Sequence, residues 1–267
     1  LLHLVEQHAP ATVHGDRQLV DASEAESYLT EIARTRFPAE VNVVWHVHRR
    51  EIADVAHSLA DHADELESDL VLMVTHGHAD FHRWLSGSLA QQVVRQAASP
   101  ILMLRLGTDG KAPSSFQQML APLDGKPGHE SGLPVAVELA RLFSASLRLL
   151  MVVPTLATLR AEDTADGQLL PSATREVLDL AERGGTQYLE QHLSRILAEG
   201  VNAAATLARG EAAATICQIA ADHQADLVVV ATHGSAGIEA FWTGSVGQRL
   251  IGRLATSFLL APARAEG

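Results

Sequence analysis

The chain is poor in cysteine. Cys217 is the only one among its 267 residues, so an internal disulfide framework is excluded and a reducing compartment is indicated. It lies in an alanine-rich apolar run, where a small buried side chain is a better interpretation than a reactive thiol. No apolar run approaches the length of a membrane span, and the first residues lack the basic flank of a signal peptide. We therefore expect a cytoplasmic protein with no membrane partner.

Positive charge is also scarce. The chain has 20 Lys and Arg residues against 32 Asp and Glu residues, which gives a formal net charge of −12. This balance disfavours a protein that follows the phosphates of nucleic acid, and it gives no attraction to anionic lipid. Small anions remain candidate ligands, because the free N–H groups of a helix N-terminus bind them locally. We expect no nucleic-acid partner.

Catalytic and metal-binding motifs are missing. The sequence has no Ser-His-Asp arrangement, no acidic pair at an active-site spacing and no phosphate loop of the Gly-Lys-Ser/Thr type. Fourteen histidines invite a metal interpretation: His46 and His48 share one face of a predicted strand, and His76, His78 and His82 crowd one loop. Neither set has a Cys or carboxylate at a diagnostic spacing. The sequence therefore predicts no catalytic residue and no metal site.

One unusual loop occurs twice. The first copy reads Thr75–Gly77, nine residues, then Gly87-Ser88; the second reads Thr232–Gly234, nine residues, then Gly244-Ser245. Each copy follows a short apolar run and precedes an amphipathic stretch. A glycine-bearing loop between a strand and a helix is where an α/β fold holds phosphate. Its repetition indicates a tandem duplication.

Hydrophobic periodicity in the second half alternates between strands and helices. It predicts strands at 117–122, 147–153, 201–208, 226–231 and 257–261, and helices at 130–143, 174–198, 210–223 and 245–254. Such alternation indicates a parallel sheet with right-handed crossovers. Ligands of these sheets lie beyond the carboxyl ends of the strands, where the strand order reverses. The turn at Asp124 and the loop at Gly234 are both predicted at carboxyl strand ends, so they can converge on one ligand.

The first half repeats this pattern from its second strand onward. Its predicted strands are 2–5, 41–47, 69–74 and 100–105, and its predicted helices are 23–35, 50–63 and 88–97. Ser23 and Glu26 have capping-box spacing at the start of the first of these helices.

The first strand and helix of the second half, about 30 residues, have no counterpart in the first half. Because that strand is central in this topology, the sheet is expected to lose pairing on both sides. Either the chain is truncated or something else fills the gap. We divide the chain into a first domain at 1–106, a linker at 107–116 and a second domain at 117–267.

At three motifs the chain resembles the universal stress protein family, specifically its tandem two-domain members. The motifs are Pro122–Gly125, Val229–Gly234 and Gly244–Val246, and the first half repeats the last two as Val74–Gly77 and Gly87–Leu89. The resemblance covers essentially the whole chain. It implies two repeats of an open, mostly parallel five-stranded sheet with helices on both faces, of the adenine nucleotide α-hydrolase-like class, with the first repeat incomplete.

The resemblance also implies a ligand. Nucleotide-binding members of the family hold ATP with a pattern of Gly, two residues, Gly, nine residues and Gly-Ser/Thr. By resemblance Gly234, Gly244 and Ser245 would lie on the phosphates, Asp124 would face the adenosine end, and Val153 would line the adenine pocket. The other residues of this implied site are Pro122, Leu123, Gly125, Ala231 and Val246. The expected cofactor is ATP or a related adenine nucleotide, with or without Mg²⁺.

The two halves depart from the pattern to different degrees. Its first glycine is Ala231 in the second half, a small residue, but Val74 in the first half, where β-branching opposes a glycine-only backbone angle. The implied second site, at Gly77, Gly87 and Ser88, also lacks an Asp-bearing turn. We therefore expect nucleotide binding mainly in the second domain.

Three functions stay open. The first is a nucleotide-dependent stress-response regulator with slow ATP hydrolysis at most. The second is an interaction module of the same fold that binds no nucleotide, in which Asp124 is a turn or capping residue and Ser245 only caps a helix. The third, an enzyme acting on a small phosphorylated metabolite, is weaker because no acid–base pair is evident.

The resemblance also predicts assembly. Domains of the family pair through their last strands, which here are Pro100–Arg105 and Ser257–Ala261. Pairing of these two edges within one chain would cover both. We expect an intramolecular pseudo-dimer that can dimerise further into a homodimer.

Overall fold

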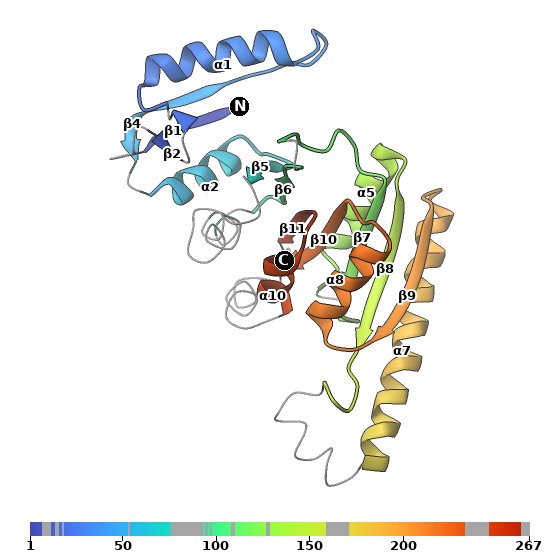
Figure 1. Cartoon of the computed structure of the whole chain (residues 1–267). Coiled ribbons are helices and arrows are strands. Elements are labelled where there is room, and N and C mark those ends of the chain that lie inside the picture. Colours follow the sequence, from blue (N-terminus) through green and yellow to red (C-terminus); the bar gives the residue numbers. More distant parts are fainter. Residues whose placement is uncertain are drawn as a thin grey trace. The chain divides into compact units, whose positions relative to one another are not determined.

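The computed structural model describes residues 1–6, 12–13, 16–17, 19–52, 54–75, 93, 96, 98–107, 110–126, 129–158, 171–232 and 246–262. Figure 1 shows the elements along the chain. The strands are β1 (Leu2–Glu6), β2 (Thr12–Val13), β3 (Asp16–Arg17), β4 (His46–Ile52), β5 (Val71–Thr75), β6 (Ile101–Arg105), β7 (Gln118–Leu123), β8 (Ser146–Val153), β9 (Ala203–Arg209), β10 (Leu227–Thr232) and β11 (Ser257–Pro262). The helices are α1 (Ala22–Arg36), α2 (Val55–Glu65), α5 (Gly132–Phe143), α7 (Pro171–Ala198), α8 (Ala212–Asp222) and α10 (Val246–Arg253).

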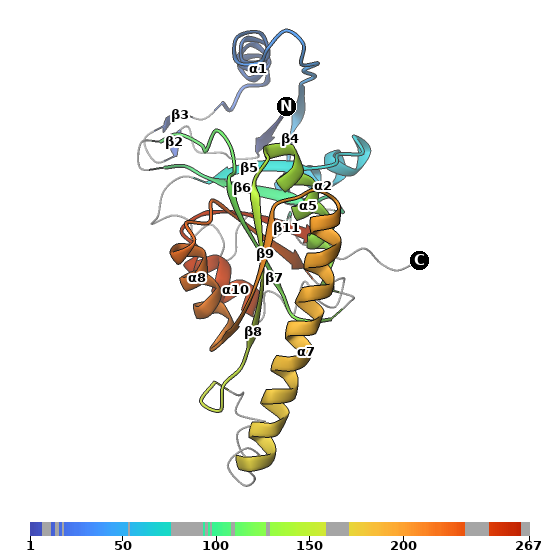
Figure 2. The ribbon, with the colours of Figure 1, turned by 90° about the vertical axis from the view of Figure 1, so that its right-hand side faces the viewer.

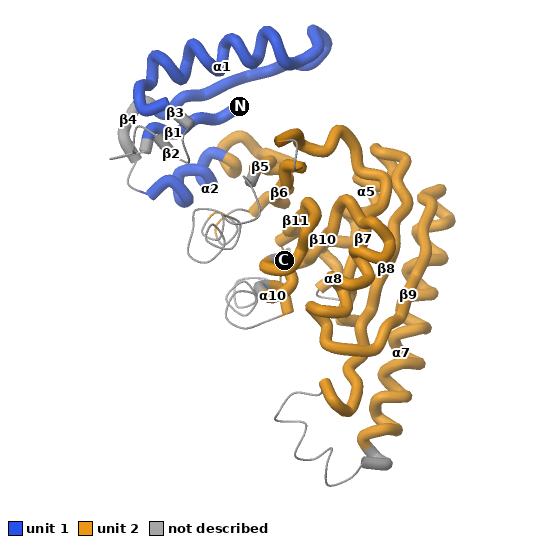
Figure 3. The backbone as a smooth tube through the Cα atoms, in the orientation of Figure 1, with its two compact units in different colours: residues 1–62 blue, residues 63–267 orange. Residues whose placement is uncertain are grey.

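The chain forms two compact units, residues 1–62 and residues 63–267, coloured separately in Figure 3. In the described part of the chain, no helix is both long enough and apolar enough to cross a membrane. The predicted helix at 88–97 falls almost wholly outside the described residues.

The larger unit is built on a seven-stranded sheet with the order β5-β6-β11-β10-β7-β8-β9. Five of these strands, β11-β10-β7-β8-β9, come from the second half and run parallel to one another. Figure 2 shows α8 and α10 on one face of these strands and α5 and α7 on the other. The predicted α/β fold, a five-stranded parallel sheet covered on both faces, is confirmed for the second repeat.

The last strands of the two halves pair with each other. Strand β11 runs antiparallel to β6, with Phe258 opposite Met103 and Leu260 opposite Ile101. These side chains are all 2% exposed or less, so the junction lies in the core. This is the pairing of last strands within one chain that the family resemblance implied. Strand β5 continues the sheet parallel to β6.

The smaller unit holds a parallel pair, β1 with β4, packed against α1. Its core contains Val5, Ala25, Leu29 and Val47. Helix α1 begins after Asp21, whose carboxylate accepts the backbone N–H groups of Ser23 and Glu24. The predicted start at Ser23 is therefore wrong: the helix begins one residue earlier, at Ala22. The predicted cap at Ser23 is wrong by two residues, because Asp21 provides the cap acceptor.

The largest error of the sequence-based elements concerns β4 and α2. The strand was predicted at 41–47 and the helix at 50–63, whereas the strand covers His46–Ile52 and the helix begins at Val55. Pairing with β1 determines where β4 begins, because Leu2 lies opposite His46 and Leu4 opposite His48. Asp54 determines where α2 begins, because its carboxylate caps the helix by accepting the N–H of His57 at 3.0 Å.

The described long strands of the first repeat fall into two different sheets. Strands β1 and β4 form a sheet of their own, while β5 and β6 belong to the seven-stranded sheet. In the second repeat β7 pairs with both β8 and β10. Among the described residues, β1 pairs only with β4, and β5 pairs only with β6.

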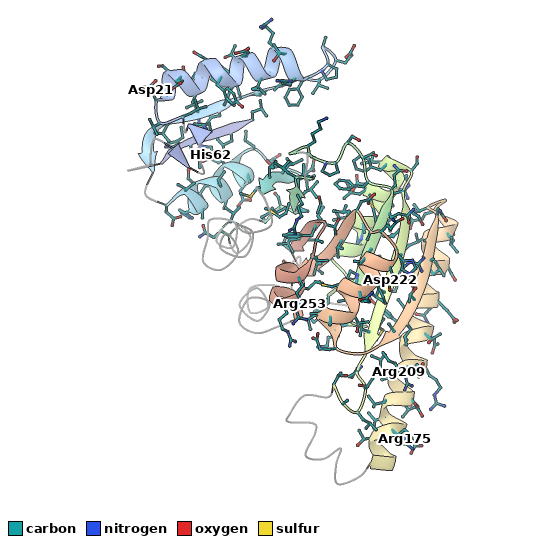
Figure 4. The ribbon with its side chains drawn as sticks, in the orientation of Figure 1. Asp21, His62, Arg175, Arg209, Asp222 and Arg253 are labelled. Atoms are coloured by element: carbon teal, nitrogen blue, oxygen red, sulfur yellow. The ribbon has the colours of Figure 1, made fainter. Side chains whose placement is uncertain are left out.

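Helix α7 approaches the sheet closely through a glycine. A Cβ built on Gly185 would lie 2.9 Å from Met151 Sδ and 2.9 Å from Leu207 Cδ1, in β8 and β9. Its neighbour Gly184 is exposed, and a Cβ there would meet nothing within 4 Å. The helix is further tied to β9 by Arg209, labelled in Figure 4, which pairs with Asp179 and Glu182 of α7.

These two glycines give a matched pair of substitutions. Gly184→Ala is expected to raise the free energy of unfolding by about 0.5–1 kcal/mol, because alanine costs less backbone entropy inside a helix. Gly185→Ala gains the same propensity but must displace Met151 and Leu207, so it should be less stable than Gly184→Ala by about 1–2 kcal/mol. Urea denaturation of the two variants measures the difference. Equal stability would contradict the close approach of α7.

Candidate functional site

The strand order reverses between β7 and β10. The chain passes from β7 to β8 and β9 on one side, then to β10 and β11 on the other. Strands β7 and β10 pair only at Leu227 with Met119 and at Val228 with Leu120, although both strands continue beyond these residues. At this reversal the sheet opens toward its carboxyl edge, which is where open α/β sheets take ligands.

Pro122 explains why the two strands separate. Gln118 accepts the N–H of Asp226, the residue before β10, so alternate residues of β7 direct their backbone groups toward β10. Pro122 has the same parity as Gln118 and has no N–H to donate. The ladder between β7 and β10 accordingly ends at Leu120. The proline at the head of the Pro-Leu-Asp-Gly motif thus contributes to the opening beside Asp124.

The end of β10 meets the start of α5. A Cβ on Gly132, the first residue of α5, would lie 3.2 Å from the backbone N of Ala231. Thr232 is 1% exposed and donates its hydroxyl to the carbonyl of Ala261 at 3.3 Å, and the Ser131 hydroxyl approaches the same carbonyl at 3.4 Å. A side chain at 132 would therefore press on the backbone at the end of β10, and glycine lets the helix begin this close to the strand end.

Asp124 is held on both of its carboxylate oxygens. Oδ1 accepts the backbone N–H of Lys126 at 3.1 Å, and Oδ2 accepts from His129 Nδ1 at 2.6 Å. The turn passes through Gly125 at φ +78°, where a Cβ would also meet Met151 Cε at 3.1 Å. Positive φ strongly favours glycine at this position. Each carboxylate oxygen has two lone pairs, so Asp124 keeps acceptor capacity for a ligand hydroxyl.

A second carboxylate lies in the same loop. Glu130 accepts the hydroxyl of Tyr188 at 2.7 Å and lies 3.3 Å from His192 Nε2. Burial raises the pKa of Tyr188 well above its usual range, and the hydrogen bond to Glu130 and the charges of Glu130 and Asp124 act in the same direction. The loop after β7 is thus tied to α7 and carries two acidic side chains, each beside a histidine.

Helix α10, which follows the second glycine loop, is positioned by α8. Glu211 is the N-cap of α8 and accepts the N–H groups of Ala213 and Ala214. Its two oxygens also lie 3.4 Å from an Arg249 nitrogen and 3.9 Å from an Arg253 nitrogen of α10. The backbone hydrogen bonds, above all that from Ala214, and the two arginines hold the pKa of Glu211 below its usual value. Figure 4 labels Arg253 on α10.

The structure describes only part of the predicted site. Pro122, Leu123, Asp124 and Gly125 lie at the end of β7, Ala231 at the end of β10, Val153 at the end of β8 and Val246 at the first position of α10. The Val153 side chain is buried, and its carbonyl accepts the N–H of Gly210 at 3.0 Å. The remaining predicted residues lie outside the described residues: Gly234, Gly244, Ser245, Gly77, Gly87 and Ser88.

Four residues near Asp124 were not expected from the sequence: His129, Glu130, Tyr188 and His192. The spacing of Tyr188 and His192, four residues apart on a predicted helix, indicated a shared face. Nothing in the sequence indicated that this face contacts the loop after β7. A second missed group, His46, His48 and His62, lies in the smaller unit.

A sequence profile of the universal stress protein family matches residues 1–105 and, separately, 115–262. The chain belongs to the universal stress protein family.

Other universal stress proteins resemble the chain in sequence or in fold. Universal stress protein YxiE of Bacillus subtilis (strain 168) is 27% identical over 135 residues, which is 51% of this chain and 91% of YxiE. A universal stress protein from Archaeoglobus fulgidus DSM 4304 has a similar fold, with a TM-score of 0.63, 17% identity and coverage of 92% of this chain and 78% of that one. A putative universal stress protein from Pseudomonas aeruginosa UCBPP-PA14 gives a TM-score of 0.61 at 14% identity, covering 98% and 81%. The two structures support the fold alone.

Glu211 makes the placement of α10 testable. Its pKa is lowered by folding, so its contribution is complete above the ordinary value of about 4.5 and is lost as the pH falls through the lowered value. Glu211→Ala should reduce the free energy of unfolding by about 1 kcal/mol at pH 7, the usual worth of an N-cap. The difference from the unsubstituted protein should shrink below about pH 4. Urea denaturation across this range is the measurement, and a difference that grows toward low pH would contradict the assignment.

Proposed function

We propose that this universal stress protein binds ATP or a related adenine nucleotide in its second repeat and acts as a nucleotide-dependent regulator. The observation that carries the proposal is the opening of the sheet between β7 and β10. The turn at Asp124 lies at one side of this reversal, and the glycine loop that begins after Thr232 starts at the other. The two motifs of the family thus enter one region from neighbouring strands.

Electrostatics support the direction in which the nucleotide lies. Asp124 and Glu130 place two carboxylates in the loop after β7, which would repel a triphosphate but can accept hydrogen bonds from ribose hydroxyls. On the other side, α10 begins directly after Gly244 and Ser245, and a helix N-terminus offers free N–H groups to phosphate. The adenosine end therefore belongs with Asp124 and the phosphates with the start of α10. Mg²⁺ would be held mainly by the phosphates and water.

We propose binding without rapid turnover. The ligand would favour one arrangement of the loop after β10 and of α10, and a partner would recognise that arrangement. This role needs no nucleophile. It is compatible with slow hydrolysis of ATP, and the acidic loop of Asp124 and Glu130 lies at the wrong end of the proposed nucleotide to act on its phosphates.

One observation favours the alternative, an interaction module that binds no nucleotide. Both oxygens of Asp124 already accept hydrogen bonds, from Lys126 and His129. Asp124 thereby completes a turn without any ligand, as Asp before Gly commonly does. The two functions differ in whether the protein takes up nucleotide at all.

The two repeats supply a matched pair of variants for nucleotide binding. Isothermal titration with ATP and Mg²⁺ should give about one site per chain. Gly244→Val should weaken binding at least about tenfold, because a branched side chain blocks close approach of the backbone to phosphate. Gly87→Val, the equivalent change in the first repeat, should leave the affinity unchanged.

Far-UV circular dichroism of both variants controls for folding. Absence of heat from ATP, together with no adenine nucleotide released from the purified protein on denaturation, would overturn the proposal in favour of the interaction module. Loss of binding in Gly87→Val instead of Gly244→Val would move the site to the first repeat.

A further inference from the structure

Three histidines gather in the smaller unit. His46 and His48 come from β4 and His62 from α2; each offers a ring nitrogen, and the three nitrogens all lie within 4.8 Å of one another. The ring centroids are 6.3 Å apart for His46 and His48, 5.2 Å for His46 and His62, and 5.4 Å for His48 and His62. Figure 4 labels His62. All three residues fall within residues 1–62, so the group belongs to a single compact unit.

The alternation of β4 creates half of this group. Val47 is 7% exposed and packs in the core beneath α1. Side chains on either side of it in the strand point to the opposite face. His46 and His48 therefore share the face of the β1–β4 pair that is turned away from α1. Their partners in β1, Leu2 and Leu4, lie on the same face and give the histidines an apolar surround.

Helix α2 completes the group. His62 is not fully exposed, and its Nδ1 lies 2.6 Å from the backbone carbonyl of Ser58, one turn earlier. A carbonyl can only accept, so Nδ1 carries the proton and Nε2 carries the free lone pair. A metal-binding histidine is usually fixed in this way, with its other ring nitrogen donating to a carbonyl or carboxylate.

The chemistry of the group suits one class of ligand. Three protonated imidazolium rings this close would repel one another, and the group contains no carboxylate among the described residues. Three neutral rings instead offer three nitrogen lone pairs to a cation. Imidazole donors suit Zn²⁺, Cu²⁺, Ni²⁺ and Co²⁺, whereas Mg²⁺ and Ca²⁺ require oxygen ligands.

We propose that His46, His48 and His62 form a binding site for a divalent transition-metal cation of the Zn²⁺ type. Zinc–nitrogen bonds of about 2.0–2.1 Å place tetrahedral ligands about 3.4 Å apart. The widest separation in the group, 4.8 Å or less, is therefore closed by modest rotation of the partly exposed rings. Three histidines leave a fourth position for water or another ligand, as in zinc sites that are not closed.

The site would also join two elements that are otherwise separate in the chain. A metal held by β4 and α2 acts as a clip between the strand and the helix, and a ligand that binds only the folded state stabilises it. Metal binding should therefore raise the stability of the smaller unit. This inference departs from the expectation that the chain has no metal site, and it is independent of nucleotide binding in the second repeat.

The test uses the full-length chain with Zn²⁺ and, separately, Co²⁺. The substitutions are His48→Gln and His62→Gln, with His57→Gln as the control. His57 is on the same helix, its side chain is 64% exposed, and it lies beside Asp61 rather than in the group. Competition with a chromophoric chelator gives the Zn²⁺ affinity, and the visible absorption of bound Co²⁺ gives its coordination.

The unsubstituted protein and His57→Gln should each bind one equivalent of Zn²⁺. His48→Gln and His62→Gln should bind it at least about tenfold more weakly or not at all, because even the loss of a residue that only supports a metal ligand lowers metal affinity 10- to 100-fold. Weak Zn²⁺ binding by the other histidines is common to all four proteins, so it does not contribute to the difference in affinity between them. Zn²⁺ should raise the melting temperature of the unsubstituted protein and of His57→Gln only.

Equal affinity and equal Co²⁺ spectra in all four proteins would overturn the proposal. Loss of Zn²⁺ binding in His57→Gln would do the same, because it would place the metal on the outer surface of α2. Because His46 is exposed, His46→Gln provides a third variant that is expected to keep the fold, and unchanged Zn²⁺ affinity in it would also reject the three-histidine site.

Discussion

The antiparallel pairing of β6 with β11 is the interaction on which the larger unit depends. It joins two strands of the first repeat to five strands of the second, and its side chains are among the most buried in the protein. Arg105 reinforces it, because its backbone N–H donates to the Ser257 hydroxyl at 3.1 Å and its guanidinium donates to the carbonyl of Leu254. Each last strand would otherwise expose an unpaired edge, and pairing within one chain satisfies both edges at once. The tandem arrangement therefore builds into one polypeptide what a second subunit would otherwise have to supply.

The second repeat was readable from sequence because its strands are buried on both faces. Continuous apolar runs such as Leu227–Ala231 are typical of a central parallel strand. The first repeat was less readable around β4, where apolar residues precede the strand and the charged residues Arg49 and Arg50 lie inside it. There the boundary is set by β1 and by the cap at Asp54, two features that hydrophobic periodicity does not detect.

Some residues of the candidate site were named from the sequence, and others became apparent only in the folded structure. Asp124 and Gly125 were named as candidate residues through the family resemblance, and their turn is local chemistry: Gly125 has positive φ, and Asp124 accepts the N–H of the residue two positions onward. His129 and Tyr188 were not identified as its neighbours, because their contacts depend on how the loop after β7 folds back and where α7 crosses the sheet. The histidine group illustrates the same limit. Strand periodicity placed His46 beside His48, but the contact of His62 with them depends on where α2 lies in the folded unit.

Met151 has a consequence for how sequences of this fold can vary. Its thioether occupies the space that a Cβ on Gly125 or on Gly185 would need, so one flexible side chain lies beneath both the Asp124 turn and the long helix. In a close-packed interior such neighbours do not change independently. A larger residue at position 185 would be tolerated where positions 151 and 207 have both become smaller, and the change at 151 would also alter the packing beneath the Asp124 turn. Substitutions on the outer helix are thereby coupled to the geometry of the carboxyl edge of the sheet.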